Sequence, residues 1–595
     1  MRLSTQNILR RERFLKYSAY VFMGSLFIFL LKATWLKYGS LYVDTFHDPW
    51  IVDEILCGKV VYRDLFYEYG FLPPYFLAGL CRVFGYYLNI FIFCGAALAA
   101  GCGLFIYRIV RLFVPRYAAT LVVTVFFVVF AFGQYYYPQA IFNFILPYSF
   151  ASLFLVFFSL TALFCLMKFI LKGKVVYAYG WVAATVLVFL SRPIIGTFVY
   201  LGFLLPLAII AYKGFFRSRL KIVPVIVAPV LISAVFYVAF LWINRAWGGF
   251  NESILTRIAV RSVDKNAGYV AQSMGLNHAG LNFLVAVAIF VVVMVCVTLL
   301  VFAVRFFTER NSVALGLVCF AAAFIIGMIF LMNMDQYRYL PIVSVALALW
   351  YAYRTLSLAG NVRDAALCAL FSVSFFMVFR IMLDADPAGC GFCFLAASLI
   401  GCYIFFFRIF SDFLCRKIKN FSVGLFHFFL IAFFIFINSF YPVVSWALLQ
   451  KRTMPVAVAR GGIIVADGRA EEAFKAVTEY LREHTDKNAT VTAVPEISGI
   501  NFFSQRRNPL HCCSPCRAFF NFCVEEEKIA GEFAAKRPDY IVVLSSKGSD
   551  HLGVDYGFKL NVWIKNNYQI EKIFGDYPYH GGMSGGMAIL KRKSG

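Results

Sequence analysis

Charged residues are scarce in this chain, because only 14% of its 595 residues are Asp, Glu, Lys or Arg. An average soluble domain has about a quarter. The shortfall excludes an ordinary soluble enzyme, a disordered protein and a nucleic-acid-binding module. Acidic residues are fewer than basic ones, 31 against 55, so the formal net charge is +24. Most of the basic excess precedes residue 450, in the connections between apolar runs. An excess in these places indicates membrane topology rather than an anionic partner.

Other patterns are absent as well. No Gly-rich phosphate loop lies among the basic connections, so nothing points to a nucleotide-sugar donor. There is no low-complexity segment and no internal repeat, and charge within the apolar runs is sparse. Membrane transporters more often have repeated halves and charged residues within their spans. A transporter or flippase for small solutes or lipid-linked saccharides is therefore the alternative to an enzyme, and the less favoured of the two.

Apolar residues dominate the chain, at 62% hydrophobic and 19% aromatic. A helix that crosses a bilayer needs about 20 consecutive apolar residues. About thirteen such runs predict a polytopic α-helical membrane protein, and they lie near 18–36, 87–107, 117–133, 144–167, 176–190, 194–212, 222–243, 280–304, 312–331, 340–358, 365–383, 388–407 and 422–446.

Basic residues fall on alternate connections between these runs, beginning with the N-terminal segment that holds Arg10, Arg11 and Arg13. Lys and Arg concentrate on the cytoplasmic side, so this side is predicted to be cytoplasmic. Most acids before residue 450 fall on the other side. The first run lacks an obvious small-residue cleavage site and is interpreted as an uncleaved anchor. We expect a multi-pass protein of the plasma (inner) membrane, with a cytoplasmic N-terminus and an extracytoplasmic C-terminal domain.

Residues 450–595 change character and predict a small α/β domain after a transmembrane domain of residues 1–449. Apolar residues at helical spacing predict a helix over 471–484, and short β-branched runs predict strands over 490–494 and 540–544. Further helices are expected over 525–536 and 558–566, the second followed by another short strand.

Four of the 16 cysteines gather in this tail, beside His511: Cys512, Cys513, Cys516 and Cys523. A zinc site usually has two separated pairs of ligands, whereas these thiols are bunched and face an oxidising compartment. Disulfides are favoured over zinc, with a connectivity that the sequence does not give.

The first outer loop, residues 37–86, concentrates acids close to the membrane. Acids in such a place suggest function, because burying them is costly unless they are paired. Asp48 precedes Pro49, a common start for a helix, and Gly58 suits its end, so Asp48 is as well explained as a helix cap as by chemistry. Asp44 has no capping role that we can assign and is the best candidate for chemistry.

Two other acids of this loop, Asp53 and Glu54, are interpreted as a solvated face or as ion-pair partners of Lys59 and Arg63. Asp44 and Asp48 could share a divalent metal ion, but no recognisable ligand spacing supports one. No metal ligand and no cofactor is therefore assigned.

At this point the loop and several later motifs resemble the C-type (GT-C) integral membrane glycosyltransferases, which include bacterial relatives of protein O-mannosyltransferases and the lipid A aminoarabinose transferase. The resemblance lies in the order and sidedness of the motifs rather than in any one of them. This chain departs from the family in having Gly70-Phe71-Leu72-Pro73 where members often have Gly-Pro. The motifs are Tyr62-Arg63-Asp64, Tyr69-Gly70, Phe142-Asn143-Phe144, Pro147-Tyr148-Ser149, Ser191-Arg192-Pro193, the segment from Asp335 through Arg338 to Pro341, Pro495-Glu496 and Asn508-Pro509.

The resemblance implies an inverting hexosyl or pentosyl transferase that uses a polyprenyl-phosphate sugar donor in the bilayer. The acceptor would be an envelope lipid, polysaccharide or protein, approached from outside. The donor carries its own leaving group, so one carboxylate suffices as general base, here Asp44 with Asp48 in reserve.

A departing phosphate needs permanently charged donors, and Arg192 and Arg338 are the candidates. The alternative for each arginine is an anchor that reaches to the lipid headgroups. Arg63, Tyr137 and Tyr337 are candidate substrate-binding residues, although tyrosines at an interface commonly belong to the aromatic belt.

The predicted sidedness can be tested with fusions expressed in a bacterial host. Alkaline phosphatase becomes active only outside the cytoplasm, so we expect an active enzyme when it is fused after residue 595. The matched fusion after residue 213, in a connection predicted to be cytoplasmic, should be inactive. The reverse pattern of phosphatase activity would overturn the orientation.

Overall fold

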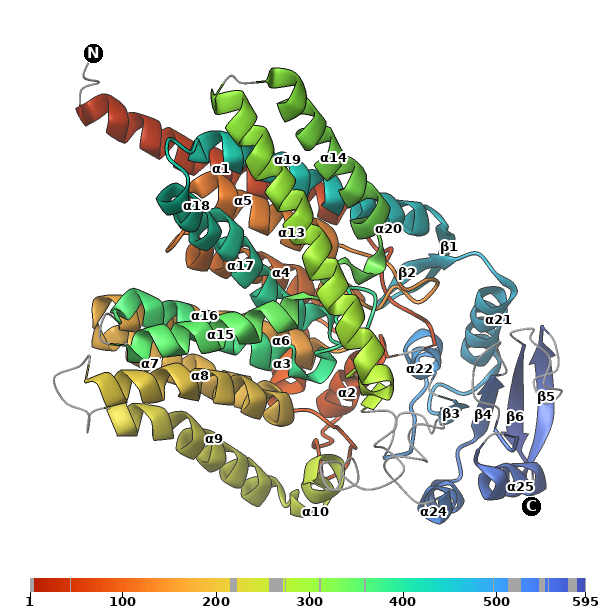
Figure 1. Ribbon diagram of the computed structural model, residues 1–595. Helices are drawn as coiled ribbons and strands as arrows, with labels where there is room; N and C mark the ends of the chain where they lie inside the picture. The colour runs from red at the N-terminus through yellow and green to blue at the C-terminus, as the bar shows by residue number, and fades with distance from the viewer. Residues whose placement is uncertain are drawn as a thin grey trace.

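The computed structural model describes most of the chain, in twelve segments that together hold all the elements named below (Figure 1). Each of the thirteen apolar runs contains helix. The described segments are residues 5–42, 44–214, 222–255, 271–272, 274–309, 312–357, 360–495, 497–511, 526–544, 552–554, 556–575 and 586–593.

Within these segments, eight helical stretches are long and apolar enough to cross a membrane. The protein is therefore an integral, multi-pass membrane protein, as predicted, while the count of about thirteen spans stays a prediction. The principal helices of this region are α1 (Thr5–Ala33), α4 (Leu88–Val110), α5 (Arg116–Val125), α6 (Phe150–Lys172), α7 (Val175–Ser191), α8 (Pro193–Lys213), α9 (Ile222–Asn244), α13 (Ala279–Glu309), α14 (Val313–Leu331), α15 (Leu340–Leu356), α16 (Val362–Met377), α17 (Leu395–Ile404), α18 (Ser411–Lys417), α19 (Val423–Asn438) and α20 (Phe440–Gln450).

Helices distant in sequence pack side by side. In Figure 1, α7, α8, α15 and α16 run together in the lower half, and α8 contacts α16 directly. Helices α13, α14 and α19 form a second group above them. The C-terminal domain lies at the right, beyond the ends of both groups.

The break between α7 and α8 follows from one proline. Pro193 cannot donate a backbone hydrogen bond and disfavours helical geometry in the residue before it. Arg192 accordingly has φ −155° and ψ 86°, and Pro193 occupies the first turn of α8. Arg192 therefore lies between the two helices, in a backbone conformation that is not helical.

Two helices form within the first outer loop, α2 (His47–Leu56) and α3 (Leu72–Phe84). The expected short helix before Gly58 is confirmed as α2. Its N-cap, however, is Phe46, which makes no capping hydrogen bond with its side chain, and Asp48 lies in the first turn. The interpretation of Asp48 as the cap of its own helix is therefore wrong.

The ion pairs of this loop are partly those expected. Lys59 pairs with Glu54 at 2.7 Å, as predicted, although Glu54 is buried rather than solvated. Asp53 pairs with Arg460 of the C-terminal domain at 3.2 Å instead of with Arg63. The domain that follows the bundle thus supplies a partner that only the fold brings near.

The C-terminal domain contains every helix and strand that the sequence predicts, within a residue or two, and also three strands and one short helix, α22 (Ser498–Ser504), that the sequence did not predict. The unpredicted strands form the hairpin of β1 (Arg452–Val458) with β2 (Gly461–Ala466) and the strand β6 (Met587–Arg592). The four-stranded sheet has the order β3-β4-β6-β5, with β3 and β4 parallel and the other pairs antiparallel. The elements that match the prediction are α21 (Arg469–His484), β3 (Val491–Val494), α24 (Glu526–Lys536), β4 (Tyr540–Leu544), α25 (Phe558–Asn567) and β5 (Tyr568–Phe574).

The expected disulfides among Cys512, Cys513, Cys516 and Cys523 fall outside the described residues. That expectation stays a prediction.

The C-terminal domain packs directly on the first outer loop. Phe46 meets Phe502 and Phe503 of α22 (Ser498–Ser504), with ring centroids 5.0 and 5.1 Å apart. The backbone N–H of Phe66 donates to the carbonyl of His511 at 3.0 Å. One continuous apolar core therefore joins the bundle, the loop and much of the sheet.

Arg452 connects three segments at this junction. Its guanidinium donates to the carbonyls of Ile464 at 2.9 Å, of Gly39 at 2.5 Å and of Pro138. The side chain is buried, and burial lowers the pKa of Arg452 to about 10. One cation thus satisfies carbonyls of the first outer loop, of a second loop and of β2.

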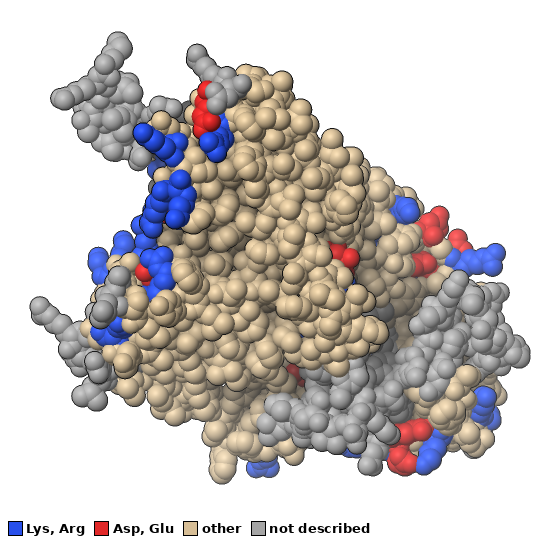
Figure 2. All heavy atoms as spheres, viewed as in Figure 1, with Lys and Arg blue, Asp and Glu red and all other residues tan. Residues whose placement is uncertain are grey.

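Cationic side chains gather along one edge of the molecule, at the helix ends remote from the C-terminal domain (Figure 2). Helix α18, with Arg416 and Lys417 exposed, lies at this edge. The separation of this edge from the C-terminal domain agrees with the predicted sidedness of basic residues.

Replacing Arg452 with Leu should lower the free energy of unfolding by about 3 kcal/mol or more, because three buried carbonyls lose their donor. The check is the melting temperature of the purified full chain in detergent. Lys451→Leu is the matched control, since Lys451 is exposed and only rests on the ring of Tyr137, 5.4 Å from its centroid. Equal melting temperatures for the two variants would contradict the role of Arg452.

Candidate functional site

Asp48, in the first outer loop, is buried where this loop meets the start of α6. One carboxylate oxygen accepts a hydrogen bond from the Tyr67 hydroxyl at 3.0 Å, and the other accepts from the backbone N–H of Phe150 at 2.8 Å. Phe150 is the first residue of α6, whose N-cap Ser149 makes no capping bond of its own. Asp48 therefore caps a helix 102 residues away rather than the helix that contains it.

Burial shifts the pKa values of Asp48 and Tyr67. It raises the pKa of Asp48 above its ordinary value of 3.8, while His47, the two hydrogen bonds and Arg192 act in the opposite direction. Burial and the neighbouring carboxylate hold the pKa of Tyr67 well above its usual range, so Tyr67 remains a donor. A helix N-terminus also favours a negative charge beside it.

Arg192 lies against the same segment of the loop. Its guanidinium carbon is 4.5 Å from the centroid of the Tyr69 ring, and its Nη1 donates to the Ser152 hydroxyl in the first turn of α6. The residue is only 6% exposed. Gly70 allows this approach, because a Cβ there would lie 2.0 Å from the carbonyl oxygen of Leu190.

Arg380, in the short helix η6 (Phe379–Ile381) after α16, contributes a second positive charge. Its charge acts on Tyr69, on Tyr148 and on Cys390. Arg192 acts on the same three residues. Neither arginine forms an ion pair with any carboxylate in the part of the chain that the structure describes. Two cations that form no ion pair among the described residues thus act on the same pair of tyrosines.

Asp44 reaches this neighbourhood from the end of the loop near α1. It is half-buried, and its φ of +54° places its backbone in the left-handed region. Its carbonyl oxygen accepts from the N–H of His47 at 2.9 Å, and its negative charge acts on Tyr69 and Cys390. The fold therefore brings together three residues that the sequence singled out, Asp44, Asp48 and Arg192.

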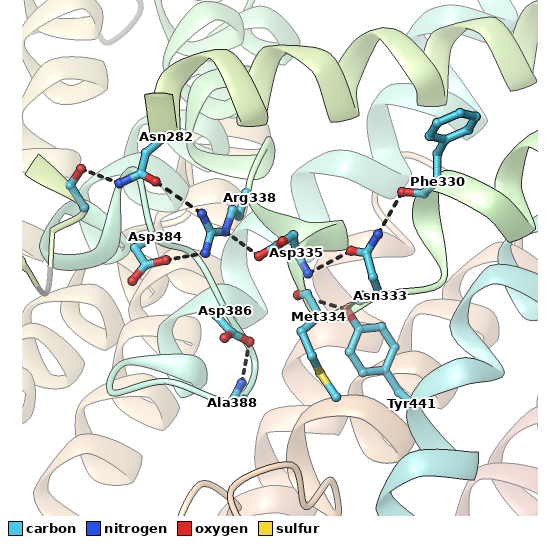
Figure 3. Close-up of polar contacts among 11 residues, drawn as sticks. Asn282, Phe330, Asn333, Met334, Asp335, Arg338, Asp384, Asp386, Ala388 and Tyr441 are labelled. Carbon is cyan, nitrogen blue, oxygen red and sulfur yellow. Dashed lines mark hydrogen bonds and ion pairs between the residues drawn. The ribbon is translucent and has the colours of Figure 1, made fainter. Parts of the chain in front are cut away.

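Arg338 has a different environment (Figure 3). Its guanidinium pairs with Asp335 at 2.7 Å and with Asp384 at 2.8 Å, and donates to the amide oxygen of Asn282 at 3.3 Å. Nearby, Asp386 accepts from the N–H of Ala388 at 2.7 Å, and burial raises the pKa of Asp386 to about 6. The charge of Arg338 is balanced within the protein, unlike that of Arg192.

The three candidate substrate-binding residues do not join this group through any described contact. Arg63 is exposed and pairs with its neighbour Asp64 at 2.7 Å. Tyr137 lies beside Lys451 at the junction with the C-terminal domain. Tyr337 is buried, donates to Asn438 and packs against Tyr441 with ring centroids 5.4 Å apart.

Sequence reasoning missed Arg380 and gave no role to Tyr69, Tyr148 or Ser152. Arg380 falls near the outer end of an expected span, 365–383, which is the signal that identified Arg192. The tyrosines stand in the quoted motifs, but nothing in their spacing indicates that they meet around an arginine.

Among the described residues, no group of three or more His, Cys, Asp or Glu side chains is placed to hold a metal ion. Of the two acids that could have shared a metal ion, Asp48 has both oxygens bonded to protein donors.

No family model matches the sequence, and neither does any curated protein. Solved structures are similar to this chain. The apo oligosaccharyltransferase of Archaeoglobus fulgidus is 13% identical, with 92% of this chain and 71% of that chain covered and a TM-score of 0.47. ArnT from Cupriavidus metallidurans bound to undecaprenyl phosphate is 10% identical, with 96% and 97% covered and a TM-score of 0.47. At these values the likeness transfers no residue roles to this chain.

The role of Asp48 as a cap predicts a difference between two substitutions. Asp48→Asn can still accept from Phe150 and meet Tyr67, whereas Asp48→Ala should cost about 1–3 kcal/mol of stability through the lost cap and the unpaired Tyr67 hydroxyl. The check is thermal unfolding of both full-length variants in detergent. Equal losses for Asn and Ala would exclude the cap.

The same melts across pH test the raised pKa. The folded protein holds the proton of Asp48 more tightly than the unfolded chain does, so the resulting stabilisation is full below 3.8 and is lost as pH rises through the folded pKa. Asp48→Asn should remove this part of the pH dependence. A wild-type profile with the opposite sign, also removed by Asp48→Asn, would contradict the shift.

Proposed function

We propose that this protein is a membrane glycosyltransferase that moves a hexosyl or pentosyl group from a polyprenyl-phosphate donor to an envelope acceptor. The reaction would take place at the extracytoplasmic face of the plasma (inner) membrane, beside the first outer loop. The acceptor would be a lipid, a polysaccharide or a protein. The motifs that resemble the C-type glycosyltransferases suggest this chemistry, and the surroundings of Arg192 support it.

The observation that carries the proposal is a buried arginine with no carboxylate partner among the described residues. Arg192 is 6% exposed, and its described contacts are a hydroxyl, two aromatic faces and backbone groups. An uncompensated buried cation is costly, and a fold tolerates one best where an anion binds. Arg380 adds a second cation to the same tyrosines. Guanidinium groups match the geometry of phosphate and carboxylate anions, and the proposed donor supplies a phosphate.

The proposed reaction needs one base and one anion site. Asp44 removes the proton from an acceptor hydroxyl or amine as the nucleophile attacks the anomeric carbon. The bond from that carbon to the phosphate oxygen breaks, and its electron pair leaves with the polyprenyl phosphate. Arg192 and Arg380 stabilise the charge that develops on this phosphate. Attack opposite the leaving group inverts the anomeric centre.

Asp44 is preferred to Asp48 as the base because of their surroundings. Both oxygens of Asp48 already accept protein hydrogen bonds, which suits a positioning role for the loop and for α6. Asp44 has a left-handed backbone, and such conformations in residues other than glycine cluster at functional sites. We assign Arg338 to holding its loops together, because two carboxylates balance its charge.

The test is a comparison of envelope glycans and lipids by mass spectrometry, in a deletion strain complemented at matched membrane expression. Wild type should restore one sugar modification that the deletion removes. Asp44→Asn should leave it missing, because loss of a general base costs about 10²- to 10⁴-fold in rate. Arg192→Gln should also fail, whereas Asp48→Asn should retain activity.

Asp467→Asn serves as the matched control, since it makes the same chemical change at an exposed residue of the C-terminal domain. Full restoration by Asp44→Asn would exclude Asp44 as the base. A deletion that changes no glycan would overturn the transferase proposal and favour the transporter.

A further inference from the structure

A chain of hydroxyl groups begins at Arg192, and the proposed function gives it no role. Nη1 of Arg192 donates to the Ser152 hydroxyl in the first turn of α6. The oxygen of Ser152 lies 3.3 Å from the hydroxyl oxygen of Tyr148, four residues earlier in the chain. The two hydroxyls therefore share one hydrogen bond, beside the guanidinium.

The burial of Ser152 decides the direction of this bond. Ser152 is 1% exposed, and its described side-chain partners are Arg192 and Tyr148. A guanidinium only donates, so it cannot accept the hydrogen of the serine. Because buried hydroxyl groups are almost always hydrogen-bonded, the Ser152 hydrogen lies on the bond to Tyr148. Tyr148 is therefore the acceptor in this bond, and its own hydrogen points toward a third group.

Tyr148 lies beside the charges of the candidate site and is only half-buried. The positive charges of Arg192 and Arg380 act on it, and the exposed residue Cys390 is another neighbour. The negative charge of Asp44 acts on the same cysteine. Hydrogen bonds in a chain polarise one another, so donation from Arg192 through Ser152 makes the O–H of Tyr148 a stronger donor. A neutral donor of this kind suits an anion.

We propose that Tyr148 is a further binding residue of the donor site, whose hydroxyl donates to a phosphate oxygen of the polyprenyl-phosphate donor beside Arg192. This inference rests on the proposed function, because it takes the donor phosphate as the anion. Hydrogen bonds to a charged oxygen are shorter and stronger than those between neutral groups. The hydroxyl of Tyr148 also stabilises the charge that grows on the phosphate as the bond to the sugar breaks.

The test measures binding of undecaprenyl phosphate to the purified full chain in detergent, by native mass spectrometry. Tyr148→Phe removes only the hydroxyl and keeps the ring, which packs on Phe142 with centroids 5.8 Å apart. This variant should bind undecaprenyl phosphate about 10- to 100-fold more weakly than wild type, the factor expected for a hydrogen bond to a charged group. Undecaprenol has the same chain without the phosphate and should bind equally to both proteins.

Ser152→Ala is the matched control, because it also removes a hydroxyl beside Arg192, but one that is buried. It should weaken the binding of undecaprenyl phosphate less than Tyr148→Phe does. A second control is Tyr136→Phe, which changes an exposed tyrosine that packs on the same Phe142 ring, with centroids 5.1 Å apart. Its binding should equal that of wild type.

Equal binding of undecaprenyl phosphate by wild type and Tyr148→Phe would overturn the role of Tyr148 and leave the donor proposal standing. Equal losses in Tyr148→Phe and Ser152→Ala would overturn the direct contact, because Tyr148 would then act only by holding Arg192. A matching loss of undecaprenol binding in Tyr148→Phe would overturn it as well. If wild type binds undecaprenyl phosphate no better than undecaprenol, the proposed donor fails, and this contact with it.

Discussion

The buried carboxylate of Asp48 is the constraint on which the candidate site depends. It accepts one hydrogen bond from Tyr67 of the first outer loop and one from the first N–H of α6, so it fixes the loop to the bundle. Arg192 is then held between Ser152 of α6 and the face of Tyr69, two residues beyond Tyr67. A shift of the loop relative to α6 would break all of these contacts at once, because Asp48, Tyr67 and Tyr69 belong to the same loop. The chain thus uses a helix cap between distant residues to position a cation.

Buried and half-buried cations in this protein fall into two kinds, and the difference has functional meaning. Arg452 donates to three carbonyls, and two carboxylates balance the charge of Arg338. Both arginines hold segments together. Arg192 and Arg380, by contrast, form no ion pair with a carboxylate among the described residues. Since a buried cation without an ion-pair partner is costly, we interpret Arg192 and Arg380 as part of a site for an anion. That anion would be the phosphate of the proposed donor.

Much of the architecture could be predicted because it rests on local patterns. Long apolar runs form helix wherever the bilayer must be crossed, since only a helix satisfies its own backbone there. Alternation and helical spacing likewise located α21, α24 and β4 to within a residue or two. The β1–β2 hairpin and β6 were missed. Strand β1 begins with a buried arginine whose partners lie on other segments, and β6 is defined by its pairing with β4 and β5.

The sequence by itself determined that this is a multi-pass membrane protein with a small α/β domain, and it singled out Asp44, Asp48 and Arg192 as candidate site residues. These conclusions follow from hydrophobic periodicity and from the cost of charge near a bilayer, both of which are properties of short segments. Tertiary structure alone decided that Asp48 caps α6, that Arg338 is neutralised by Asp335 and Asp384, and that the charges of Arg380 and Arg192 both act on Tyr69. Whether a charge is balanced depends on neighbours that are distant in the chain, and spacing along the sequence carries no information about them.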